Sequence, residues 1–160
     1  MSRASESVER PFRYLLRVRF GECDAQKVVF NVHYGTYIDL AAIEFLRTLG
    51  LGPLLFHGPL DYQLVKQTIE WRASAHFDEV MELAVHADSL GNTSFTLHTV
   101  FRISGSDAIL ATAETVYVLV DAQTLVKTPL TNELRTALGH GATGMVVDHA
   151  DSTPRRERAE

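Results

Sequence analysis

The chain has 160 residues, with 15 basic side chains against 20 acidic ones and a formal net charge of −5. This length suits one domain with its own hydrophobic core, and the acidic balance argues against nucleic acid as a partner. A few local cations could still bind a small anion. The single cysteine, Cys23, excludes an internal disulfide framework and a cysteine-based zinc site. No cluster of metal-ligating residue types appears, so we expect neither a metal nor a cofactor.

The two ends of the chain differ in composition from the region between them. Residues 1–10 are polar and contain no apolar segment of the kind found in a secretory signal, so we expect a flexible N-terminus. No stretch approaches the roughly 20 apolar residues of a membrane span. We therefore expect a cytoplasmic protein with no membrane partner. The domain is predicted at 11–139, and residues 140–160 are expected to form a disordered or loosely packed tail.

The first half of the chain predicts one strand and one long helix. Apolar and polar residues alternate from Phe12 to Phe20, which indicates a half-buried strand. Residues 32–49 are apolar around most of a helical circumference, which predicts a helix buried on nearly all sides. Asn31 is the expected N-cap, and Gly50 is expected to end the helix. The glycines and prolines of residues 50–61 predict a loop.

The second half of the chain predicts strands only. Turn residues separate four strand-like segments, which suggests an antiparallel meander. These segments are residues 62–71, 80–89, 94–104 and 109–121. A buried helix needs a sheet around it, so the predicted class is α+β, with about five antiparallel strands around one central helix. So few strands leave edges and faces uncovered, which predicts a homodimer or a homotetramer.

A short motif lies between the first strand and the helix. Asp24 follows the strand, the apolar run 28–30 comes next, and Tyr34 lies ten positions after Asp24. This motif resembles the signature of the hotdog-fold acyl-CoA thioesterases, the 4-hydroxybenzoyl-CoA thioesterase-like family. The order of elements is also similar, as are the segments TIEWRASAHFDEV and DAQTLVKTPL. The resemblance covers about residues 12–138 and implies the hotdog fold.

The resemblance implies hydrolysis of an acyl-CoA thioester to a free acid and CoA. Asp24 would act as the nucleophile or as the general base for a water, and the sequence leaves both open. Asn31 would present its backbone N–H, together with the positive end of the helix, to the thioester oxygen. Relatives often carry glycine three positions after the aspartate, where this chain has Lys27. Glycine there would permit a positive φ, so Lys27 needs either that conformation or another loop path.

Further side chains are candidates for binding the substrate. Tyr34 is expected near the site or the dimer seam, and Asp39 is a carboxylate on the central helix. Cations near strand ends could meet the CoA phosphates, and hydroxyls after a turn could meet the pantetheine. The binding candidates are Tyr34, Asp39, Thr93, Ser94, Arg72 and Lys127, with Arg102 as a further cation near a strand end. Glu22, close to Asp24, is expected to be an ordinary surface acid.

Hydratases of this fold rely on an Asp/His pair that the sequence does not show, and two other functions fit the same fold. One is a thioesterase that acts on acyl carrier protein, for which this acidic chain offers no evident basic docking patch. The other is an acyl-CoA-binding protein that has lost hydrolysis. Two departures from the family pattern, Lys27 and Asn31, favour it.

Overall fold

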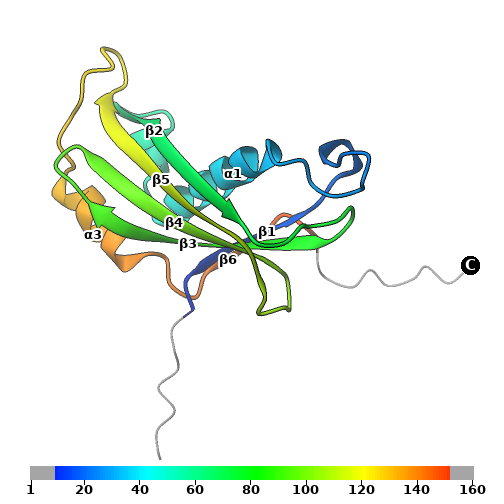
Figure 1. The fold of residues 1–160 in the computed structure, drawn as a ribbon. Coiled ribbons are helices and arrows are strands. Elements are labelled where there is room, and N and C mark those ends of the chain that lie inside the picture. Colours follow the sequence, from blue (N-terminus) through cyan, green and yellow to red (C-terminus); the bar gives the residue numbers. More distant parts are fainter. Residues whose placement is uncertain (1–9, 152–160) are drawn as a thin grey trace, which may run out of the picture.

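The computed structural model describes residues 10–151. One curved sheet packs one of its faces against the long helix α1 (His33–Thr48), as Figure 1 shows. The strands are β1 (Phe12–Arg17), β2 (Leu60–Trp71), β3 (Val80–Leu90), β4 (Ser94–Ile103), β5 (Ile109–Asp121) and β6 (Val146–Asp148). The shorter elements are the 3-10 turn η1 (Phe20–Glu22), α2 (Gly52–Leu55) and α3 (Asn132–His140).

The sheet has six strands in the order β2-β5-β4-β3-β1-β6. The five longer strands pair antiparallel, as predicted, while β6 runs parallel to β1 and places Val146 opposite Arg13. The predicted sheet of about five antiparallel strands is therefore corrected to a mixed sheet of six strands. The strand that the sequence did not predict, β6, has three residues, which is too short for an alternation of apolar and polar residues to reveal it.

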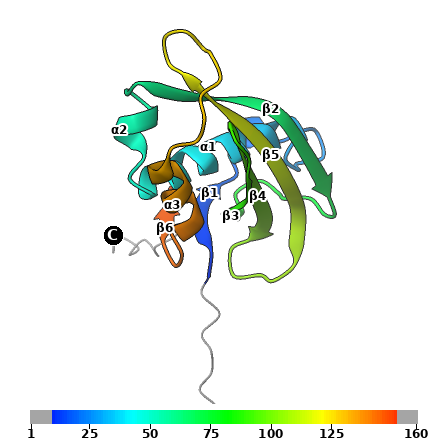
Figure 2. The same cartoon turned by 90° about the vertical axis from the view of Figure 1, so that its left-hand side faces the viewer.

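The core lies between α1 and the concave face of the sheet, which curves around one side of the helix (Figure 2). Alternate residues of β3, such as Met81 and Leu83, are fully buried and face the helix. From α1, Tyr37 and Phe45 are fully buried against them. The alternation read from the sequence therefore identifies the inner face of the sheet, and it fixes which side chains project outward.

Helix α1 ends as predicted but begins differently. Gly50 adopts φ 78° and donates its N–H to the Arg47 carbonyl, while Leu51 donates to Leu46, which closes the C-terminus. At the N-terminus Val32 occupies the capping position, and no side chain caps the helix there. The prediction of Asn31 as N-cap is therefore wrong, because the helix begins two residues after it.

Helix α1 is not buried on all sides within one chain. Leu40 is 37% exposed, and Thr36, Asp39 and Arg47 are exposed as well. The prediction of a helix buried nearly all round is corrected for the single chain, since the sheet covers only one side of α1. A mostly apolar circumference with an exposed strip is consistent with a partner over that strip.

The segment after α3 is more ordered than the sequence suggested. Tyr14 and His149 share a hydrogen bond between Oη and Nδ1 at 3.0 Å, and Ala150 is 4% exposed. Residues 140–151 therefore differ from the expected loose tail, because β6 pairs with β1 and buries apolar side chains there. The rest of the predicted tail, residues 152–160, and the predicted flexible residues 1–9 lie outside the described range.

Helix α3 was not predicted. Thr131 caps it by accepting the Leu134 N–H at 3.2 Å, and Leu134 and Leu138 are buried one turn apart. Within residues 10–151, none of the helices combines the length and the apolar character that a membrane crossing needs. The same part of the chain holds no group of three or more His, Cys, Asp or Glu side chains placed to hold a metal ion. The cytoplasmic location stays a prediction.

If β6 stabilises the domain, removing it has a measurable cost. We expect a chain ending at Gly144 to lose about 1–3 kcal/mol of unfolding free energy relative to a chain ending at Asp151, since backbone bonds to β1 and the burial of Ala150 are lost. Urea denaturation of the two chains measures the difference. Equal midpoints would show that β6 adds nothing to stability.

Candidate active site

The segment between β1 and α1 folds into a small hairpin over residues 22–30. Asp24 donates its N–H to the Val28 carbonyl at 2.9 Å, and Phe30 donates to the Glu22 carbonyl at 3.0 Å. The segment that follows β2 also bonds to the hairpin, because Val29 donates its N–H to the Ala75 carbonyl at 2.9 Å. The hairpin is therefore held from two sides, and it fixes where Asp24 lies relative to the start of α1.

Lys27 closes the turn of this hairpin in a left-handed conformation. Its φ is 61°, and its N–H donates to the Asp24 carbonyl at 2.9 Å. A tight turn followed by a left-handed residue is a common way to connect two hairpin strands, and glycine is the residue favoured there. The chain thus keeps the backbone path that glycine would permit. The departure at Lys27 has a conformational cost and does not reroute the loop.

Glu22, at the start of the hairpin, is a buried carboxylate. Only 7% of the residue is exposed, so the expectation of a surface acid is wrong. Its carboxylate accepts the Arg19 backbone N–H at 2.8 Å and the Arg19 guanidinium at 2.9 Å. Burial alone would raise the pKa of Glu22, but the hydrogen bonds from Arg19 outweigh it and leave that pKa below its ordinary value. The spacing of three residues between Arg19 and Glu22 was the available signal in the sequence.

A cleft of about 420 Å³ opens beside this hairpin. Its lining includes Asp24, Asn31 and Tyr34 from the hairpin and the start of α1, together with Trp71 and Arg72 at the end of β2. Asp24 is exposed, and its Oδ1 accepts the Gln26 N–H at 2.8 Å. Among residues 10–151, the backbone N–H of Asn31 has no hydrogen-bond acceptor. An exposed carboxylate and an N–H without an acceptor thus line the same cleft near the N-terminus of α1.

Two aromatic side chains, Tyr34 and Trp71, are among the residues that line the cleft. Tyr34 is 1% exposed, and its ring lies 5.7 Å from that of Trp71 and 5.2 Å from that of Phe101. Burial raises the pKa of Tyr34, so its hydroxyl stays protonated near neutral pH. Of these three rings, the one with substantial exposed surface in the cleft is Trp71, which is 43% exposed.

The remaining binding candidates lie away from this cleft. On β5, the partner of Ser94 is seven residues from the partner of Trp71, a separation of about 23 Å along the strand. Thr93 and Lys127 lie at that far end as well, since Thr93 accepts a hydrogen bond from Leu119 and Lys127 pairs with Val120. Within one chain, these three residues are not brought together with Asp24.

Asp39 also lies outside the cleft, on the exposed side of α1. Its charge acts on the half-buried Tyr62 and the buried Tyr117, whose rings lie 5.2 Å apart. Burial and then the Asp39 charge raise the pKa of Tyr62 to about 12. Asp39 therefore faces a tyrosine pair of the sheet and lies apart from the catalytic candidates.

Comparison with known proteins places the chain in a family. Residues 18–138 match the thioesterase-like superfamily. Acyl-CoA thioester hydrolase YbgC of Escherichia coli O6:H1 is 28% identical over 111 residues, which cover 69% of this chain and 82% of that protein. A 1,4-dihydroxy-2-naphthoyl-CoA hydrolase of Synechococcus elongatus is 25% identical over 121 residues, which cover 74% of this chain and 88% of that protein.

A solved structure agrees with these matches. The crystal structure of a hypothetical protein from Aquifex aeolicus superposes with a TM-score of 0.71 at 28% identity and covers 80% of this chain and 99% of that one. The chain therefore belongs to the thioesterase-like superfamily. The predicted family resemblance and the predicted enzyme class, thioester hydrolase, are confirmed.

The left-handed conformation of Lys27 makes a prediction about stability. Replacing Lys27→Gly removes the steric cost of that conformation, and we expect a gain of about 0.5–1 kcal/mol in unfolding free energy. The control is Lys27→Ala, which removes the same side-chain charge but keeps a Cβ, and we expect no gain from it. Thermal unfolding of the three proteins measures both changes. An equal gain in both variants would mean that the side chain, and not the backbone, causes the cost.

The ion pair between Arg19 and Glu22 should make the stability of the protein depend on pH. Replacing Glu22→Gln removes the carboxylate that Arg19 contacts, and we expect a loss of about 1–3 kcal/mol at pH 7. The pKa of Glu22 is lowered in the folded state, so its contribution is present above the unfolded pKa of about 4.3 and is lost as the pH falls through the folded value. The difference between wild type and variant should therefore shrink below about pH 4. Urea denaturation from pH 7 to pH 3 measures it, and a difference independent of pH would contradict the assignment.

Proposed function

We propose that the protein is an acyl-CoA thioesterase whose reaction takes place in the cleft beside the 22–30 hairpin. The observation that carries the proposal is the meeting of the exposed Asp24 carboxylate and the unpartnered Asn31 N–H at the N-terminus of α1. The names of the relatives, an acyl-CoA thioester hydrolase and a naphthoyl-CoA hydrolase, support a CoA thioester as the substrate.

In the proposed reaction, the thioester carbonyl oxygen accepts a hydrogen bond from the Asn31 N–H. The positive end of α1 adds to the stabilisation of the negative charge that develops on this oxygen. Asp24 then acts in one of two ways. It attacks the carbonyl carbon and forms an anhydride that water hydrolyses, or it takes a proton from a water that attacks the carbon directly. In both cases the C–S bond breaks, and CoA leaves as the thiol.

The proposed binding mode follows from the lining of the cleft. Trp71, which is 43% exposed and packs edge-on against Tyr34, offers a surface on which a flat or apolar acyl group can pack. Arg72 also lines the cleft and is the candidate within one chain for the CoA phosphates. The substrate roles of Asp39, Thr93, Ser94 and Lys127 require a second chain to bring these residues near the cleft, because they lie elsewhere in a single chain.

We propose self-association through β2, as a homodimer or a homotetramer. This strand is an edge of the sheet, and Leu64 and Val65 in its middle are 54% and 57% exposed. An exposed edge with apolar side chains readily pairs with another chain. The exposed strip of α1 that includes Leu40 offers further apolar surface for such a contact.

The alternative of a non-catalytic binding protein loses one of its two supports. Lys27 follows the backbone path of a glycine, so it does not displace Asp24. An acyl carrier protein as the thioester donor is a matter of substrate preference in the same cleft, which the chemistry at Asp24 does not distinguish.

Removing the reactive carboxylate tests the proposal. We expect Asp24→Asn to lower kcat for acyl-CoA hydrolysis by about 100-fold or more, because the amide can serve neither as nucleophile nor as base. The matched control is Asp88→Asn, an exposed aspartate on the outer side of β3, for which we expect activity within twofold of wild type. Thiol release from aliphatic and aromatic acyl-CoAs measures both variants. Undiminished turnover by Asp24→Asn would contradict the role of Asp24.

A further inference from the structure

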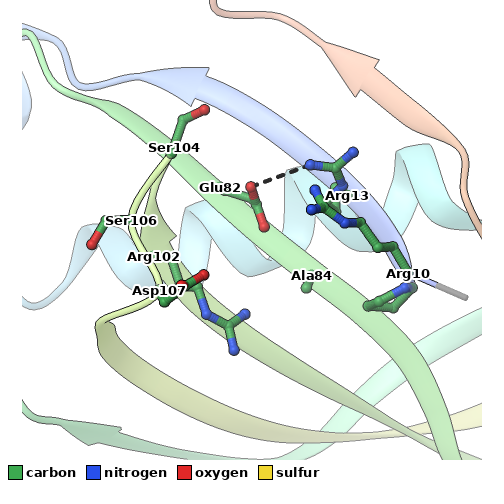
Figure 3. A pocket seen from close by; sticks show the side chains of 10 residues that line it. Arg10, Arg13, Glu82, Ala84, Arg102, Ser104, Ser106 and Asp107 are labelled. Carbon is green, nitrogen blue, oxygen red and sulfur yellow. Dashed lines mark ion pairs between the residues drawn. The ribbon is translucent and has the colours of Figure 1, made fainter. Parts of the chain in front are cut away.

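A second hollow, of about 430 Å³, lies on the face of the sheet that is turned away from α1. Three arginines line it, one before β1, one on β1 and one on β4: Arg10, Arg13 and Arg102. We call it the arginine hollow. Figure 3 shows Glu82 on β3 between Arg13 and Arg102, with Ser104 and Asp107 at the turn that follows β4.

The arginine hollow is separate from the Asp24 cleft. Along β3, Met81 and Leu83 face the core and are fully buried, so Glu82 between them projects to the opposite face. Arg102, which pairs with Glu82 across the strands, projects to the same outer face. The Asp24 cleft contains Tyr34 of α1 and so lies on the inner side. The two sites have no lining residue in common.

The charges in the arginine hollow are not balanced within the described chain. Arg13 pairs with Glu82 at 3.6 Å, which is longer than the roughly 2.7–2.9 Å of a charge-assisted hydrogen bond. Arg10 and Arg102 form no ion pair with any residue in the range 10–151. Asp107 is the second carboxylate of the lining, and it is exposed to solvent. Three cations thus face two anions, in a chain whose overall charge is −5.

One donor in the hollow is buried without an acceptor. The Nε of Arg13 is shielded from solvent and has no hydrogen-bond partner among the described residues, while its side chain as a whole is 23% exposed. A buried N–H without an acceptor is costly, and a shift of the Arg13 side chain that brought this N–H to an anion in the hollow would remove the cost. A solvated surface arginine has no such requirement, because water satisfies every N–H of its guanidinium.

We propose that the arginine hollow binds a small anion that carries phosphate. Guanidinium groups present paired N–H donors that match the oxygens of a phosphate, and two of these groups are free to do so. The hydroxyl of Ser106 accepts the Ala108 N–H, which leaves its own proton available to donate. The volume exceeds that of a single phosphate, so a diphosphate or a phosphate ester fits. Because the site lies across the sheet from Asp24, it can be filled while the substrate is bound.

Calorimetric titration of the full chain with pyrophosphate, at constant ionic strength, tests this site. We expect wild type to bind one pyrophosphate per chain. The double variant Arg10→Gln/Arg102→Gln removes the two free cations, and we expect binding about tenfold weaker or worse. The control Arg17→Gln removes one positive charge from β1 outside the hollow, and we expect affinity within twofold of wild type. Binding that is absent from wild type, or equal in all three proteins, would overturn the proposal.

Two further experiments identify the source of the phosphate and test the main competing explanation. The titration is repeated with saturating CoA. Unchanged pyrophosphate binding supports an independent phosphate ligand, and displacement supports the same site with the phosphates of CoA as its occupant. Sedimentation of wild type and the double variant tests the competing explanation, an interface between copies of the chain. A change in oligomer mass without pyrophosphate binding to wild type would overturn the proposal.

Discussion

The backbone pairing within residues 22–30 is the constraint on which the candidate active site depends. It joins the end of β1 to the start of α1 by a path that leaves little freedom to either, since the Phe30 N–H is bound to the Glu22 carbonyl and the Asp24 N–H to the Val28 carbonyl. Asp24 alone is an ordinary exposed carboxylate. It becomes a candidate for catalysis because this pairing holds it next to an unpartnered N–H at the N-terminus of a helix.

Several costs in the structure are concentrated around this hairpin. Lys27 adopts a conformation that most residues avoid, and Glu22 is a carboxylate in a buried position. Each is compensated locally, Lys27 by its bond to the Asp24 carbonyl and Glu22 by two hydrogen bonds from Arg19. Strained or buried polar residues with dedicated partners are often found where a protein holds reactive groups in place. The arginine hollow differs, because there the donors outnumber the acceptors that the described chain provides.

The sequence predicted those parts of the molecule that repeat a pattern. Strand-like segments of ten or more residues between turn residues identified β2 to β5, and the glycine at position 50 marked the end of α1. It did not predict β6, because three residues hold too little pattern, or α3, although Thr131 and the spacing of Leu134 and Leu138 were usable signals. The motif predicted Asp24, Asn31 and Tyr34 in one region, and the structure places Arg72, a candidate from its position near a strand end, beside them. The sequence did not separate Thr93, Ser94 and Lys127 from them, since distance across a sheet depends on register, which one sequence does not specify.

The central claim is geometric, and a structure with a bound ligand tests it most directly. The measurement is a crystal structure of the full chain with an acyl-CoA analogue in which a non-hydrolysable thioether or amide replaces the reactive thioester. The account predicts that a bound amide analogue places its carbonyl oxygen about 2.7–3.1 Å from the Asn31 nitrogen and its carbonyl carbon beside the Asp24 carboxylate. An analogue whose carbonyl lies away from both groups would contradict it, whatever the activity of the protein.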